Sequence, residues 1–220
     1  MGSRPFDPEQ YAARSAGPDG VPLERFEVAY ATEAPWDIGR PQPAVIDAVE
    51  AGHIAGTVLD VGCGTGINAI ELARRGLEVH AFDPIPAAVA RAREHAAAAG
   101  VELEPFVHDA LHLDELGRTY DTVLDSGVFH VFSDADRPRY AAGVRSVLQP
   151  GGCLVLICFS EREQRPGGPR RVSEPELRAT FADGFEVVEL ARTRYVTTNR
   201  PDGGHAWLLV ARCMDPVASG

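Results

Sequence analysis

The feature that most constrains this chain is the segment Val58–Gly66, in which a short apolar run leads into glycines at positions 62, 64 and 66. Glycine has no Cβ atom, so a loop of this kind lets the backbone turn sharply and approach a ligand closely. The pattern predicts a buried strand, then a ligand-binding loop, then a helix. The third glycine comes too early for the dinucleotide pattern G-x-G-x-x-G.

Asp60 lies near the carboxyl end of the predicted strand, beside the loop where a dinucleotide would place its pyrophosphate. A fixed negative charge at this point is poorly matched to phosphate. It suits a ligand that carries an ammonium group and no phosphate, such as S-adenosylmethionine.

Strand-like and helix-like segments alternate from residue 44 onward, which is typical of parallel βαβ units. Two late strands, Phe185–Leu190 and Ala206–Cys213, are separated by a turn-rich segment and predict an antiparallel pair at the sheet edge. The other expected strands span residues 58–61, 79–82, 103–107, 122–124 and 153–159. The expected helices span residues 9–14, 23–32, 68–75, 86–99, 133–148 and 174–181.

From this order of elements we expect one Rossmann-like α/β domain over residues 44–220, with helices on both faces of a mostly parallel sheet. The proline-rich residues 1–43 are expected to form a helical arm or lid.

Acidic residues also follow the next two predicted strands. Asp83 closes the second strand, where a carboxylate can accept hydrogen bonds from both ribose hydroxyls, and Asp109 after the third strand could accept one from an adenine amino group. Each could instead be a solvated loop residue or a helix cap. The ordered set favours a nucleoside-binding edge, because ligands of open α/β sheets bind at the carboxyl ends of the strands.

With these motifs the chain resembles the class I S-adenosylmethionine-dependent methyltransferases over roughly residues 44–213. Val58–Gly66 is similar to the first motif of that family, His108–Ala110 to its adenine contact, Tyr120–Asp125 to its fourth motif and Gln149–Gly152 to the turn before its fifth strand. The resemblance implies a seven-stranded sheet whose last strand is antiparallel, and S-adenosylmethionine as cofactor. The cofactor-binding residues that we expect are Trp36, Asp60, Gly62, Cys63, Gly64, Asp83, Pro84, Asp109, Ala110, Asp125 and Ser126.

Two shorter segments, Pro35–Arg40 and Asp125–His130, look like those of the thiopurine S-methyltransferase and tellurite-resistance methyltransferase group. Trp36 could place its ring against the sulfonium, or it could simply anchor the arm. Arg40, Phe129 and Arg170 are the expected substrate contacts. For the arginines the alternatives are a surface ion pair or a solvated loop.

A sulfonium methyl group is already activated, so the protein need only hold an acceptor lone pair in line with it. A thiolate or an aromatic nitrogen needs little further help, whereas a hydroxyl acceptor usually needs a base. His130 is the expected catalytic residue; the alternative is a hydrogen-bonded histidine of the pocket wall.

Composition excludes several other classes of protein. The balance of 21 basic against 32 acidic residues gives a net charge of −11, so we expect no nucleic-acid partner. The chain contains no lysine, which removes Schiff-base enzymes and the phosphate-binding loop that ends in lysine. We expect no metal at His108 and His112, which sit at a strand exit. With no leader peptide, no membrane span and no C-x-x-C pair, the expected location is the cytoplasm.

The sequence therefore predicts an enzyme that moves a methyl group from S-adenosylmethionine to sulfur or nitrogen of a small molecule, with oxygen possible. Two alternatives remain open at this point. One is a protein that only binds S-adenosylmethionine, and the other, which Asp60 disfavours, is a nucleotide-dependent oxidoreductase on the same sheet.

Overall fold

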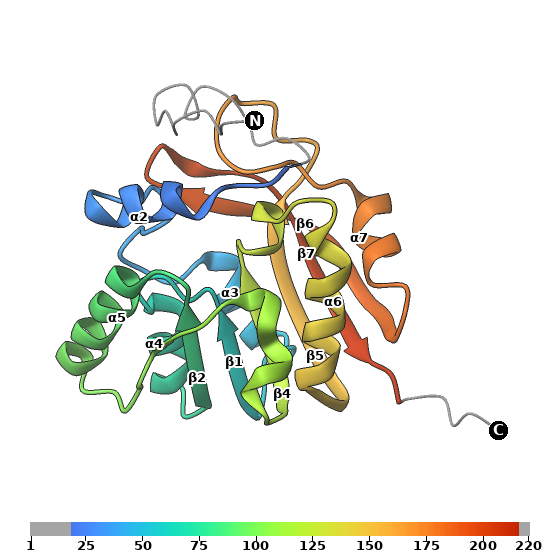
Figure 1. The fold of residues 1–220 in the computed structure, drawn as a ribbon, viewed down its shortest axis with the longest axis horizontal. Coiled ribbons are helices and arrows are strands. Elements are labelled where there is room, and N and C mark those ends of the chain that lie inside the picture. The colour runs from blue at the N-terminus through green and yellow to red at the C-terminus, as the bar shows by residue number, and fades with distance from the viewer. Residues whose placement is uncertain (1–18, 216–220) are drawn as a thin grey trace, which may run out of the picture.

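The structure, a computed structural model, describes residues 19–215. Seven strands form one sheet in the order β3-β2-β1-β4-β5-β7-β6 (Figure 1). Strands β1 to β5 pair in parallel, and β7 runs antiparallel to both β5 and β6. The strands are β1 (Thr57–Val61), β2 (Glu78–Asp83), β3 (Phe106–Val107), β4 (Tyr120–Ser126), β5 (Leu148–Phe159), β6 (Phe185–Thr197) and β7 (Arg200–Cys213). The predicted Rossmann-like fold, including its antiparallel last strand, is confirmed.

Helices cover both faces of the sheet (Figure 1). Apolar residues of α3 and α4 pack on one face together with α5, whereas η1, α6 and α7 pack on the other. The helices are α2 (Leu23–Ala31), α3 (Pro43–Glu50), α4 (Ile67–Arg74), α5 (Pro86–Ala99), η1 (Ala110–Leu116), η2 (Phe129–Val131), α6 (Asp136–Val147) and α7 (Glu174–Thr180). The strands of the parallel sheet are buried between these layers, which explains why β1 and residues 153–159 of β5 are mostly apolar.

Several helix boundaries follow directly from local chemistry. Proline begins α5, and Gly100 ends it with a φ of 67°, a left-handed conformation that glycine adopts without strain. A capping box begins α7, where Ser173 and Glu176 each accept a hydrogen bond from the other's backbone N–H.

Three expectations about the elements need correction or lie outside the structure. The strand expected over residues 103–107 is reduced to Phe106–Val107, because Pro105 has no N–H group with which to extend the ladder. The turn expected around residues 199–204 is shorter, because β7 begins at Arg200, which pairs with Thr197. The helix expected at residues 9–14 lies outside the described residues.

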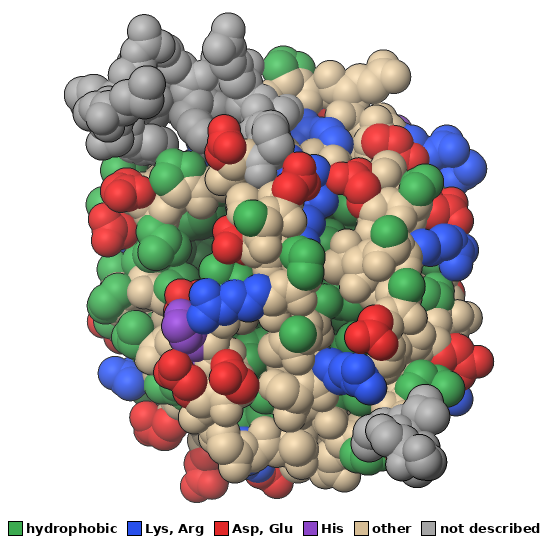
Figure 2. All heavy atoms as spheres, turned by 45° about the vertical axis from the view of Figure 1, so that its right-hand side comes forward, with side chains coloured by type: hydrophobic (Ala, Val, Ile, Leu, Met, Phe, Trp, Pro, Cys, Tyr) green, Lys and Arg blue, Asp and Glu red, His purple; other side chains and the backbone are tan. Residues whose placement is uncertain are grey.

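On the face drawn in Figure 2, arginine side chains are scattered among aspartates and glutamates and do not gather into a stripe. Within residues 19–215, no helix has the length and apolar character needed to cross a membrane.

Candidate functional site

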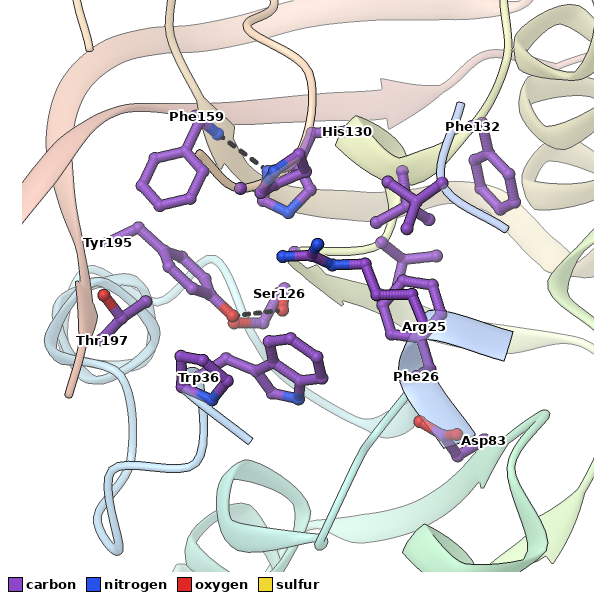
Figure 3. Close-up of a pocket in the computed structure, with 18 of the residues that line it drawn as sticks. Arg25, Phe26, Trp36, Asp83, Ser126, His130, Phe132, Phe159, Tyr195 and Thr197 are labelled. Atoms are coloured by element: carbon purple, nitrogen blue, oxygen red, sulfur yellow. Dashed lines mark hydrogen bonds between the residues drawn. The ribbon is translucent and has the colours of Figure 1, made fainter. Parts of the chain in front are cut away.

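Two adjoining cavities open at the carboxyl ends of β1, β2 and β4. The larger has a volume of about 260 Å³ and the smaller, beside the glycine loop, about 50 Å³. Trp36, Gly62, Ser126 and Tyr195 line both, so the cavities meet at these residues. Figure 3 shows the larger cavity.

The glycine loop between β1 and α4 can be built only with glycine at its key positions. Gly62 and Gly64 have φ values of 61° and 57°, in the left-handed region that strains other residues. A Cβ atom on Gly62 would lie 2.4 Å from Cγ2 of Val128, and one on Gly64 would lie 2.8 Å from the Tyr30 hydroxyl oxygen. Between them, Cys63 lines the smaller cavity, and burial raises the pKa of its thiol well above the usual value.

The side chain of Asp60 is fully buried and lines neither cavity. Its Oδ2 atom has no hydrogen-bond partner among the described residues. Burial, with smaller contributions from the nearby carboxyl groups of Asp125 and Asp83, raises the pKa of Asp60 to about 8. The sequence predicted a fixed negative charge here; the structure corrects this, because burial favours the neutral form of the Asp60 carboxyl group at neutral pH.

Asp83, the last residue of β2, lines the larger cavity and holds the glycine loop. Its Oδ2 accepts the N–H of Gly64 at 3.0 Å, and its Oδ1 accepts the N–H of Ile85 at 2.9 Å. Burial raises the pKa of Asp83 to about 6, despite these two bonds. Pro84, the next residue, also lines the larger cavity.

Asp109 and Ala110 line the same cavity at the start of η1. Asp109 caps this helix, since its Oδ1 accepts the N–H of Leu111 at 2.9 Å. Nearby, a ring nitrogen of His108 lies 2.9 Å from the backbone carbonyl oxygen of His112. Among residues 19–215, no group of His, Cys, Asp and Glu side chains is placed to hold a metal ion.

Asp125 and Ser126, at the end of β4, have different surroundings. Asp125 is fully buried away from both cavities and accepts hydrogen bonds from the N–H groups of Val128 and Phe129 and from the Tyr140 hydroxyl, at 2.7, 3.0 and 2.7 Å. This corrects its expected contact with the cofactor, because its oxygens are used to shape the turn after β4. Ser126 lines both cavities, and its Oγ has no partner among the described residues.

His130, in η2, lies in the wall of the larger cavity (Figure 3). Its Nδ1 accepts the N–H of Phe159 at 3.0 Å, and its ring stacks on the Phe159 ring at 5.3 Å. Burial, together with the positive charges of Arg171 and Arg137, lowers the pKa of His130 to about 3. The only free lone pair of the neutral ring is therefore already used, and Nε2 carries the proton. The structure corrects the expectation of a general base and favours the pocket-wall alternative.

Trp36 joins the arm to the site. Its ring lines both cavities, its Nε1 donates to the Tyr30 hydroxyl at 3.0 Å, and its ring meets those of Phe26 and Tyr30 edge-on. The two roles left open for Trp36, cofactor contact and anchor of the arm, are both compatible with this position.

Of the expected substrate contacts, only Arg40 lies at the site. It is exposed, lines the smaller cavity beside the glycine loop and has no ionic partner among the described residues. Phe129 is fully buried against Tyr140 and Phe181. Arg170 pairs with Asp134 and Glu176 outside the cavity, so neither contact is supported. Phe129 and His130 are neighbours in the same short helix, and the helical turn points one into the core and the other into the cavity.

Sequence reasoning missed much of the larger cavity's wall. Arg25 and Phe26 come from α2, whereas Phe132, Phe159 and Tyr195 come from three distant segments (Figure 3). The sequence predicted a helix over residues 23–32 and gave no sign that this helix covers a cavity. Nothing local in the sequence marks Tyr195 as part of the site.

Comparisons with known proteins agree with this geometry. A family model described as a methyltransferase domain matches residues 58–152. A 2-heptyl-1-hydroxyquinolin-4(1H)-one methyltransferase of Mycobacteroides abscessus is 32% identical over 182 residues, which are 78% of this chain and 80% of that protein. The chain belongs to the S-adenosylmethionine-dependent methyltransferases.

This methyltransferase is also similar to a probable thiol methyltransferase 2 of Arabidopsis thaliana, at 29% identity over 71% of this chain and 70% of the relative. A solved structure described by the conversion of a disulfide bond into a thioacetal group during echinomycin biosynthesis matches with a TM-score of 0.79 and 32% identity, over 87% of this chain and 92% of that one.

Two observations support the fit of S-adenosylmethionine to this site. Gly62 and Gly64 bring backbone without side chains to the cavities, and the Ser126 hydroxyl, which lines both cavities, has no hydrogen-bond partner among the described residues. An amino acid portion of a ligand would satisfy that hydroxyl.

Proposed function

We propose that this methyltransferase acts on a small aromatic heterocycle or thiol, at sulfur or nitrogen, with oxygen as a further acceptor atom. The observation that carries this proposal is the larger cavity, whose walls are mainly apolar and aromatic and which adjoins the glycine loop. The cavity of about 260 Å³ also includes Asp83 and Asp109 on the side proposed for the nucleoside, so the space left for the acceptor suits a small compound rather than a macromolecule.

The named relatives support the same class of acceptor. One is a methyltransferase of a hydroxyquinolone, and another is a probable thiol methyltransferase. Both names describe small-molecule acceptors.

For the cofactor, we propose that each end of the molecule meets a different strand terminus. Asp83 would bind the ribose hydroxyls, Asp109 and Ala110 the adenine, and Arg40 the methionine carboxylate. Backbone groups of residues 62–64 and the Ser126 hydroxyl would contact the methionine portion, and Trp36 the sulfonium. Their positions around the two adjoining cavities support this assignment.

Bound S-adenosylmethionine supplies a methyl group on a positively charged sulfur, ready for displacement. The protein's part is to hold the acceptor atom in line and to exclude water, which can lower a barrier by on the order of 7–11 kcal/mol in favourable cases. Aromatic side chains of the arm and of β5 and β6 would orient the acceptor ring. His130 would act as a neutral hydrogen-bond donor through Nε2.

We also propose that residues 1–43 act as an arm that closes the cavity over the domain formed by residues 44–220. Side chains of α2 and of Trp36 in the cavity wall support this proposal. We propose a cytoplasmic location as well, which is supported by four cysteines that are all free thiols.

The function is tested by incubating the protein with S-adenosylmethionine labelled in its methyl group and a panel of thiols, heterocyclic amines, N-hydroxy heterocycles and phenols. We expect labelled product with at least one thiol or heteroaromatic acceptor. Tight binding of S-adenosylhomocysteine in calorimetry without transfer to any member would instead indicate a protein that only binds the cofactor.

A further inference from the structure

The end of β6 that forms part of the acceptor wall lies at an open edge of the sheet. Among residues 19–215, β6 is the last strand in the sheet order, so no further strand lies along its outer side. On its inner side the register with β7 skips Val196, because it shifts between Tyr195 and Thr197. The backbone N–H and C=O groups of Val196 therefore need partners from another part of the chain.

Gln42, the residue before α3, supplies those partners. Its Oε1 accepts the N–H of Val196 at 3.0 Å, and its Nε2 donates to the carbonyl oxygen of the same residue at 2.8 Å. Because one backbone group donates and the other accepts, the two bonds fix the orientation of the amide. The side chain of Gln42 is buried and does not cap α3, so its hydrogen bonds serve the edge of β6.

The other bonds of segment 35–42 join it to the cofactor side of the site. The backbone N–H of Gln42 donates to Oδ1 of Asn68, near the start of α4, at 3.0 Å. Oδ2 of Asp37 accepts the hydroxyl of Thr65, in the glycine loop, at 2.9 Å. Five of the eight residues of this segment line the smaller cavity. Segment 35–42 thus connects the glycine loop to the end of β6.

The residue next to Val196 lies where the two cavities meet. Tyr195 lines both cavities, and its hydroxyl donates to the carbonyl oxygen of Ser126 at 3.0 Å (Figure 3). A displacement of Val196 would therefore move Tyr195 at the junction through which the methyl group passes.

We infer that Gln42 is a positioning residue for methyl transfer, which sets the distance between the glycine loop and the wall of the acceptor cavity at residues 195–197. Transfer requires the acceptor atom to lie in line with the methyl group, and a misplacement of about 1 Å can slow a reaction by about a hundredfold. This inference rests on the proposed function, in which the cofactor lies at the glycine loop and the acceptor in the larger cavity.

Gln42→Leu removes both bonds to Val196 and keeps the bonds to Asn68 and Thr65, which use the backbone and Asp37. We expect the Kd of S-adenosylhomocysteine to change by less than about threefold, because the cofactor side stays in place. The kcat for the acceptor of the panel that gives most product should fall by about tenfold to a hundredfold. The matched control is Gln149→Leu, at an exposed position on β5, which should leave both values unchanged.

Gln42→Glu provides a rescue that depends on pH. A protonated glutamic acid offers the same pattern as the amide, because its carbonyl oxygen accepts and its O–H donates. The ionised form places an acceptor against the carbonyl oxygen of Val196. The ratio of its kcat to that of the unaltered protein at the same pH should therefore rise as the pH falls from about 8 to about 6, where a buried carboxyl group takes up a proton. The ratio for Gln149→Glu should stay constant.

Hydrogen exchange of the Val196 N–H tests the same link without any acceptor. S-adenosylhomocysteine should slow this exchange in the unaltered protein, because it restrains the segment that lines its cavity. In Gln42→Leu the exchange should be faster, and the slowing by S-adenosylhomocysteine should be lost. The rates are read residue by residue by nuclear magnetic resonance.

Four results would overturn the inference. They are exchange at Val196 that S-adenosylhomocysteine leaves unchanged, slowing that survives in Gln42→Leu, equal losses of kcat and cofactor affinity in that variant, and a relative kcat of Gln42→Glu that does not rise at lower pH. Absence of methyl transfer to every acceptor of the panel would instead overturn the proposed function, and the exchange rates would then decide the inference on their own.

Discussion

The carboxyl group of Asp60 shows how burial alters the chemistry expected of a residue at a strand end. Its side chain has no access to solvent, and its neighbours include two further carboxyl groups, those of Asp83 and Asp125. Burial raises the pKa to about 8 for Asp60 and to about 6 for each of the other two. The folded protein without cofactor therefore binds protons that the unfolded chain has released.

This difference predicts that the cofactor-free protein loses stability as the pH rises from about 4 to 8. Stability falls wherever the folded state holds more protons than the unfolded state, and a raised carboxyl pKa produces that condition. Asp60→Asn should remove part of this slope and increase the free energy of unfolding at pH 8 by about 1–3 kcal/mol. Urea denaturation at pH 5.5 and pH 8 measures both effects.

The matched control is Asp114→Asn, which changes an exposed aspartate of η1. It should leave the slope of stability against pH as it is. A protein that is equally stable at the two pH values, or an Asp60→Asn variant with the original slope, would contradict the raised pKa.

Single residues also show the limits of reading the site from the sequence. The position of the loop glycines, Asp83 and Asp109 at the cavities was predictable, because the place of a residue after a strand determines which edge of the sheet it reaches. Phe129 was wrongly predicted because one step along a helix turns a side chain by about 100°. The position of Arg25 in the cavity wall was missed because it depends on where α2 docks, which local sequence does not encode.

At the scale of elements, the loop of residues 163–171 after β5 is an ordered wall of the acceptor cavity. The Arg171 guanidinium donates to the backbone carbonyl oxygens of Glu163, Arg165, Gly167 and Pro169, at 2.5–3.0 Å. It also lies over the Phe159 ring, 5.2 Å from the ring centre. One side chain thus holds the loop in the shape that closes the cavity.

Replacement of this side chain by Arg171→Met should release the loop. The lost bonds leave carbonyl groups without partners, so we expect the free energy of unfolding to fall by about 2–4 kcal/mol. The KM of the acceptor should rise more than the Kd of S-adenosylhomocysteine, because the loop lines only the larger cavity. Denaturation curves, calorimetry and steady-state kinetics provide the three measurements.

Arg178→Met is the matched control, since Arg178 is exposed on α7 and forms only an i,i+4 pair with Glu174. It should change stability by no more than about 0.5 kcal/mol. Equal effects of the two substitutions, or equal increases in KM and Kd for Arg171→Met, would contradict a specific role in shaping the acceptor wall.

The elements themselves were largely predictable, because parallel strands and amphipathic helices have distinct apolar periods. The errors fall where tertiary pairing decides the outcome. Residues 200–204 look like a turn because they contain proline and two glycines, yet they extend β7 because residues 194–197 of β6 supply partners. α3 was not recognised, although Ala44, Val45 and Ala48 are buried against the sheet.

For the whole molecule, the two cavities are assembled from different parts of the chain. The smaller cavity is lined mainly by residues between 36 and 68, whereas the larger one also needs α2 and residues from β5 to β7. The proposed nucleoside contacts Asp83 and Asp109 line the larger cavity as well, so the part of its wall that is separate from the proposed cofactor contacts comes from α2 and from β5 to β7.

Removal of residues 1–35 tests this division. We expect the sheet to remain folded and the affinity for S-adenosylhomocysteine to fall by less than about tenfold. The KM of the acceptor should rise by more than about tenfold, because the lost residues then contribute more than about 1.4 kcal/mol to acceptor binding. Calorimetry and steady-state kinetics on the shortened chain give both values. Unaltered acceptor kinetics would show that the arm does not take part in acceptor binding.

The placement of Tyr195 on β6 and of Arg200 on β7 has a consequence for the order of assembly. The glycine loop, Asp83 and Asp109 follow strands β1 to β3, which lie far earlier in the sequence. The larger cavity therefore lacks one of its walls until the antiparallel pair of β6 and β7 has joined the sheet beside β5.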